Sequence, residues 1–182
     1  MKNEKIEVLY YSDNQATEKE FKSAASEGNY LHLATHGFFY PDPKKVKLDT
    51  SEIKVEYGDV SFRGGSRGFG VSSFVENENP LMRSGLVLAG ANNVWSQETK
   101  NNVEDGVLTA MEITQLNLQN TQLVTLSACE TGLGDIKGSE GVYGLQRAFK
   151  MAGVKFIIMS LWQVPDQETK EFMLLFYKNL FL

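Results

Sequence analysis

The chain has 182 residues and a formal net charge of −5, a length sufficient for one domain with a full core. Because phosphate contacts need a basic surface, this acidic balance argues against unaided nucleic-acid binding. No apolar run approaches the ~18 residues of a membrane span, and Met1–Glu7 is too polar for a signal peptide. A single cysteine excludes an internal disulfide and favours a reducing, cytoplasmic compartment.

The first elements along the chain read as strand, helix and strand. Ile6–Tyr11 is an apolar run rich in strand formers, and Thr17–Glu20 has the pattern of a capping box that starts a helix. Tyr30–Thr35 reads as a second, buried strand. This order predicts a right-handed parallel crossover between the two strands.

An insertion, residues 41–80, interrupts the alternation of strands and helices. Apolar and charged residues alternate over Ile53–Tyr57, and a second short run, Val60–Phe62, follows the dipeptide Gly58-Asp59. This pattern predicts a β-hairpin with a two-residue turn. The glycine-rich stretch Gly64–Gly70 is expected to be weakly ordered. Because the insertion follows His36 directly in the sequence, we expect it to lie over or beside the cleft that holds this histidine.

Strands and helices alternate again in the second half of the chain. The predicted elements are a strand at Leu86–Gly90, a capped helix at Thr109–Leu116, a strand at Gln122–Ala128, a helix at Ser139–Ala152, a strand at Val154–Trp162 and a final helix from Pro165. The alternation predicts an α/β fold with a mostly parallel sheet, helices on both faces and the hairpin as an insertion. Since apolar segments reach both ends, we expect residues 1–182 to be one domain of a longer protein.

Two polar side chains stand where predicted strands end. His36 follows the strand Tyr30–Thr35, and Cys129 follows the strand Gln122–Ala128. If these strands are parallel neighbours, both side chains emerge at the carboxyl edge of the sheet, where open α/β sheets build their sites. A histidine lowers the thiol pKa from about 8.5 and can protonate a leaving amine. The backbone N–H groups of Gly37 and Cys129 are natural oxyanion donors.

Other interpretations of these residues stay open. A lone cysteine at the end of an apolar strand is often only a small buried hydrophobe. His32 and His36 have no third partner for a metal ion, so we expect no metal and no cofactor, and His32 reads as a packed strand residue. Thr131–Gly134 after a strand could cradle phosphate in a flavodoxin-like nucleotide-binding module. A catalytically silent scaffold is the remaining alternative.

Several motifs occur in an order that resembles the CHAT domain. They are HLATHG at His32–Gly37, LSACETGLG at Leu126–Gly134, GVYGLQRAF at Gly141–Phe149, SLW at Ser160–Trp162 and DGVLTAMEI at Asp105–Ile113. The resemblance implies a caspase-like fold and a cysteine endopeptidase of the caspase and separase clan, with His36 and Cys129 as its dyad, cleaving a specific protein. Many members of this family follow tetratricopeptide repeats, and some are proteases of bacterial defence systems, which implies regulation by attached domains.

The resemblance also bears on substrate choice. In some relatives, an acid two positions before the cysteine selects a basic residue before the scissile bond, the P1 residue, whereas this chain has Ser127 there. A hydroxyl cannot compensate a buried arginine or lysine, so we expect an uncharged P1 residue. Asp105 and Asp135 are the carboxylates nearest to the matched motifs, and either would reverse this preference by lining the pocket.

Overall fold

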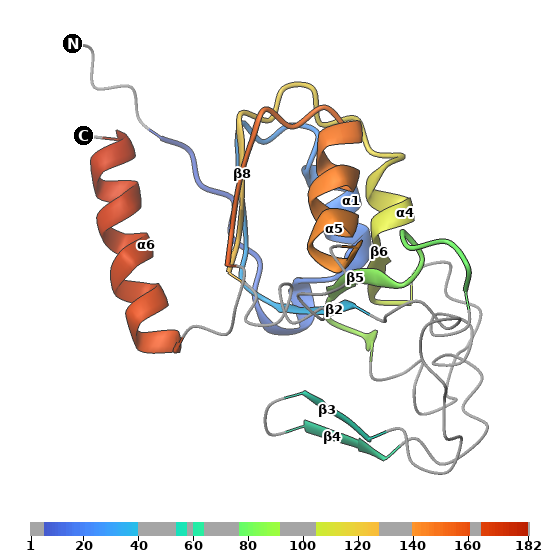
Figure 1. Ribbon diagram of the computed structural model, residues 1–182. Helices are drawn as coiled ribbons and strands as arrows, with labels where there is room; N and C mark the ends of the chain where they lie inside the picture. Colours follow the sequence, from blue (N-terminus) through green and yellow to red (C-terminus); the bar gives the residue numbers. More distant parts are fainter. Residues whose placement is uncertain are drawn as a thin grey trace.

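The computed structural model describes residues 6–39, 54–57, 60–63, 77–91, 105–127, 140–160 and 165–181. The elements in chain order (Figure 1) are η1 Asp13–Gln15, α1 Glu18–Ala24, β1 Tyr30–Leu33, β2 His36–Phe39, β3 Lys54–Tyr57, β4 Val60–Arg63, β5 Ser84–Val87, β6 Val107–Thr109, α4 Ala110–Ile113, β7 Leu123–Leu126, α5 Glu140–Met151, β8 Phe156–Met159 and α6 Asp166–Phe181.

A parallel sheet forms the centre of the molecule. Its strand order is β1-β7-β8, with Leu33 opposite Leu126 and Leu126 opposite Met159 at the carboxyl ends. Figure 1 shows α6 on one face of this sheet and α1, α4 and α5 on the other. The predicted α/β architecture, a parallel sheet with helices on both faces, is therefore confirmed.

The main hydrophobic core lies between this sheet and α5. Val124 and Leu126 of β7 and Leu145 and Phe149 of α5 are almost completely buried within it. All four residues of β7 are buried, because β7 is the middle strand. Burying each large apolar side chain contributes about 1.5–3 kcal/mol, so this layer fixes the carboxyl end of β7 at Leu126.

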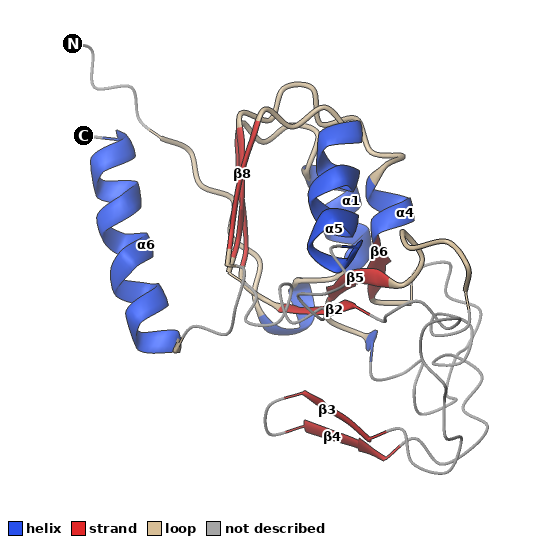
Figure 2. Cartoon of the chain, in the orientation of Figure 1, coloured by secondary structure: helices blue, strands red, loops and turns tan. Residues whose placement is uncertain are grey.

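A second, antiparallel sheet was not predicted from the sequence. Its order is β2-β5-β6, and His36, Val87 and Val107 lie side by side across it. The predicted strand Tyr30–Thr35 ends early at Leu33, because the chain leaves the parallel sheet there and pairs with β5 from His36 onward. The strand predicted at Leu86–Gly90 begins two residues earlier, at Ser84. Figure 2 shows these short strands beside the central sheet.

The strand predicted at Ile6–Tyr11 is wrong. Residues 6–11 have no regular secondary structure, and Val8 and Tyr10 are 75% and 81% exposed. A run of strand formers becomes a strand only when a neighbouring strand supplies hydrogen bonds and a packing surface, and in the described chain this segment has neither. The predicted crossover from this segment into β1 is therefore absent.

Elements signalled by local residues are where the sequence predicts them. Thr17 caps α1 by accepting a hydrogen bond from the N–H of Glu20, and Thr109 and Glu112 form a reciprocal capping box on α4. Helix α4 ends at Ile113, earlier than predicted. Strands β3 and β4 form the predicted antiparallel hairpin, whereas the glycine-rich stretch 64–70 lies outside the described residues.

Candidate functional site

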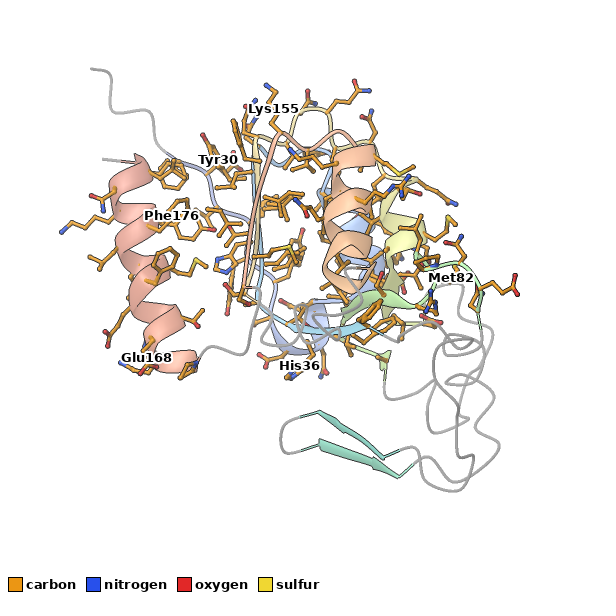
Figure 3. The ribbon with its side chains drawn as sticks, viewed as in Figure 1. Tyr30, His36, Met82, Lys155, Glu168 and Phe176 are labelled. Atoms are coloured by element: carbon orange, nitrogen blue, oxygen red, sulfur yellow. The ribbon has the colours of Figure 1, made fainter. Side chains whose placement is uncertain are left out.

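His36 lies at the carboxyl edge of the parallel sheet. It comes three residues after the end of β1 and is the first residue of β2. Figure 3 shows it at the opposite end of the sheet from Tyr30 and Lys155, which stand at the amino ends of β1 and β8. It is exposed, so its imidazole is accessible from solvent. The histidine half of the predicted site is thus at the expected edge.

Strand β7 leads toward Cys129 beside β1. Leu126 is opposite Leu33, and the N–H of Ser127 donates to the carbonyl of Leu33 at 2.9 Å, so the pairing persists one residue beyond both strands. Positions 36 and 129 each come three residues after this matched pair. Cys129 itself lies outside the described residues, so its contact with His36 stays a prediction.

Ser127 forms a hydrogen bond with His32. Its Oγ lies 2.7 Å from Nε2 of His32, whose ring packs against Tyr177 of α6 at a centroid distance of 5.5 Å. The Tyr177 hydroxyl donates to Oγ1 of Thr125 at 2.9 Å. The hydroxyl proposed for the substrate pocket is thus engaged on the face of the sheet that α6 covers.

Burial shifts the titration of both rings in this cluster. It lowers the pKa of His32, because a charged imidazolium loses water there. It also raises the pKa of Tyr177, partly offset by the hydrogen bond to Thr125. The sequence predicted a packed residue at position 32, and the His32 ring does contact Tyr177, but the residue as a whole is exposed and its bond to Ser127 was not predicted. The signal for that bond was the alternation of side chains, since His32 and Ser127 occupy one face at neighbouring strand ends.

Asp105 lies just outside the antiparallel sheet, at the edge where β2 begins with His36 and β6 begins with Val107. Strands β2 and β6 both run antiparallel to β5, so the residues just before His36 and just before Val107 extend from the same edge. With neighbouring strands about 4.8 Å apart, β2 and β6 are on the order of 10 Å apart. One Asp105 carboxylate oxygen accepts from the N–H of Val107 at 2.8 Å, which fixes the carboxylate at this edge.

An ionic cluster built around the buried Glu18 supports the turn that carries Asp105. Oε2 of Glu18 accepts from the N–H of Gly106 at 2.9 Å, and Gly106 adopts a φ of +80° that favours glycine. Lys22 joins Oε1 of Glu18 at 2.6 Å to Oε1 of Glu112 at 3.0 Å. Burial raises the pKa of Glu112. Hydrogen bonds from Thr109 and the Lys22 ammonium lower it by more, so the pKa lies below its usual value. The sequence did not predict this cluster.

The remaining predicted residues are only partly described. Gly37 is buried within β2 opposite Leu86, and its role as an oxyanion donor stays a prediction. Asp135 and Thr131–Gly134 lie outside the described residues. Within the described part of the chain, no cluster of three or more His, Cys, Asp or Glu residues is suited to a metal ion. No described helix has the length and apolar character needed to cross a bilayer.

Comparison with known proteins gives one family. A family model described as the CHAT domain matches residues 4–181. Tetratricopeptide repeat protein 28 of Mus musculus is 28% identical over 167 residues, which are 92% of this chain and 6% of that protein. Its counterpart in Homo sapiens is 33% identical over 78 residues, 43% of this chain and 3% of that protein. The chain thus spans a small part of both relatives. No solved structure matches.

Proposed function

Because this chain belongs to the CHAT domain family, which is related to caspase-like peptidases, we propose that it is a caspase-like cysteine endopeptidase with His36 and Cys129 as its dyad. The observation that carries the proposal is the register of β1 and β7. Leu33 of β1 is opposite Leu126 of β7, and each dyad residue comes three residues after its member of this pair in the sequence. Parallel strands present such residues at one edge of a sheet.

The two side chains are suited to peptide hydrolysis. His36 takes the thiol proton, and the Cys129 sulfur attacks the carbonyl carbon of the scissile peptide bond. Backbone N–H groups of Gly37 and Cys129 stabilise the oxyanion of the tetrahedral intermediate. As the C–N bond breaks, His36 protonates the leaving amine, and it then removes a proton from the water that hydrolyses the acyl-enzyme. The exposure of His36 supports access of a protein substrate.

The dyad is tested by two substitutions and one chemical block. Cys129→Ala removes the nucleophile and His36→Ala removes the base, so both variants are expected to lose cleavage of a peptide library by at least 100-fold. The chain has one cysteine, so wild-type protein treated with iodoacetamide serves as the chemical control. A folded Cys129→Ala protein that cleaves at the wild-type rate contradicts the proposal, and the silent scaffold then becomes the better description.

We place substrate selection at Ser127, with Asp105 or Asp135 as the competing determinant. Ser127 carries no charge, and its hydroxyl is already bonded to His32, so it offers nothing to a basic P1 residue. An uncharged P1 residue is expected on these grounds. Asp105 is the stronger competitor, because it extends from the same sheet edge as His36.

A peptide set that varies only at P1 tests this preference. Cleavage is expected to be fastest with uncharged P1 residues and unchanged in Asp105→Asn and Asp135→Asn. A dominant preference for arginine or lysine that disappears in either variant overturns the neutral pocket and assigns the selecting carboxylate.

The relatives named above are tetratricopeptide repeat proteins, which supports attached repeats as regulators of this activity.

A further inference from the structure

The link between the two sheets determines where His36 stands. Strand β1 ends at Leu33 in the parallel sheet, and β2 begins at His36 in the antiparallel sheet. Only Ala34 and Thr35 join them. Thr35 is half-buried, and its hydroxyl donates a hydrogen bond to the carbonyl of Val87. The side chain of the residue before the histidine therefore attaches this link to β5.

The acceptor of this bond is the strand partner of the histidine itself. Val87 is the residue of β5 that lies opposite His36. The Thr35 hydroxyl thus ties the start of β2 to the same residue against which His36 is paired. We propose that Thr35 is a positioning residue that holds the His36 imidazole in the orientation needed to activate Cys129. This inference rests on the proposed function and adds to it a residue that does not touch substrate.

A side-chain bond is needed here because of the position of β2. It is an edge strand of its sheet, and His36 is its first residue. The end of an edge strand has hydrogen bonds on one side only, so it opens readily. A general base must be held within hydrogen-bond reach of its proton, and a displacement of about 1 Å can cost 100-fold in rate. The Thr35 hydroxyl adds a hydrogen bond between this end of β2 and Val87, the β5 residue that pairs with His36.

The proposal is tested without a known substrate through the reactivity of the single cysteine. Only the thiolate reacts rapidly with iodoacetamide, so the pH dependence of alkylation at Cys129 reports the thiol pKa. If His36 lowers this pKa, His36→Ala moves the alkylation midpoint upward toward about 8.5. A rise of one pKa unit lowers the thiolate fraction about tenfold at a pH below both midpoints.

Three variants isolate the hydroxyl of Thr35. Thr35→Val keeps the branched shape and removes the hydroxyl, so its alkylation midpoint is expected to rise by about one unit toward that of His36→Ala. Thr35→Ser keeps a hydroxyl and is expected to retain the wild-type profile. Thr121→Val is the matched control, because the buried Thr121 hydroxyl also donates to a carbonyl, that of Gly28 at 3.0 Å. It precedes β7 at the amino edge, so its alkylation profile is expected to be unchanged.

Each outcome supports or overturns the inference. A folded Thr35→Val protein with the wild-type midpoint overturns it, as does an equal upward shift in Thr121→Val, which would indicate a general loss of stability. If His36→Ala itself leaves the midpoint unchanged, the proposed dyad fails rather than the role of Thr35 alone. If circular dichroism shows that Thr35→Val is unfolded, Thr35→Ala against Thr35→Ser decides, with the serine variant expected at the wild-type midpoint and the alanine variant above it.

Discussion

Glu18 is a carboxylate that the fold removes almost completely from water. It is 2% exposed, and its two oxygens bond the Lys22 ammonium and the N–H of Gly106. Lys22 also reaches Glu112, so one ammonium serves two carboxylates on different helices. Removing the ammonium leaves the buried carboxylate without its main compensating charge, and such a loss is costly.

Lys22→Met is therefore expected to lower the free energy of unfolding. Loss of one partner of a buried pair costs about 3–5 kcal/mol, and because Lys22 is 24% exposed, solvent screening reduces the expected loss to about 2 kcal/mol. Urea unfolding measures it, with the exposed Lys19→Met of the same helix as the control. The double variant Glu18→Gln/Lys22→Met should recover stability, because the carboxylate at position 18 is then a neutral amide that needs no compensating charge. If the single and double variants are equally unstable, the ionic explanation is wrong.

At the scale of the element, the middle strand of the antiparallel sheet depends on one glycine. A Cβ at Gly85 would stand 2.5 Å from the carbonyl oxygen of Leu108 and 2.8 Å from the Phe38 ring. These atoms belong to β6 and β2, the two strands that flank β5. The absence of a side chain at position 85 thus lets the sheet that carries His36 close on both sides.

Gly85→Ala is expected to destabilise the chain by about 1–3 kcal/mol, as overpacking does. The added methyl group pushes β2 and β6 away from β5, so the amides of β2 should also exchange hydrogen faster than in wild type. Urea unfolding and hydrogen exchange measure the two effects. Adding Phe38→Leu should not restore stability, because the Leu108 carbonyl remains in place. Wild-type stability in the single variant would show that the strands have room to separate.

Elements set by neighbouring residues were predictable from the sequence, and elements set by distant pairing were not. Thr17 and Thr109 signal their helices because each cap bonds an N–H three residues away. Where β1 ends and β2 begins depends on Leu126 and Val87, which are more than 50 residues away in the sequence, and the sequence carries no local sign of them. Residues 6–11 have strand formers, but whether such a run becomes a strand depends on a partner that the local sequence does not reveal. His36 was found from the strand before it. The links from Thr35 to Val87 and from His32 to Ser127 required the register.

At the scale of the whole molecule, two groups make the folded state sensitive to acid. Burial lowers the pKa of His32 from its usual 6.5. The pKa of Glu112 lies below its usual 4.5, because hydrogen bonds from Thr109 and the Lys22 ammonium outweigh burial. For both groups, the unfolded chain binds a proton at a higher pH than the folded chain. Falling pH therefore favours unfolding in each case.

The two contributions are expected in separate pH windows. Stability from His32 is fully present above pH 6.5 and is lost as the pH falls toward the folded pKa. Stability from Glu112 is present above pH 4.5 and is lost at lower pH. Urea unfolding at about pH 7.5, 5.5 and 3.5, values chosen around the two reference pKa values, should show two successive decreases. His32→Gln removes the titrating imidazole and should flatten the first, whereas Glu112→Gln preserves a capping-box residue and should flatten the second. An unchanged first decrease in His32→Gln would assign that window to another group.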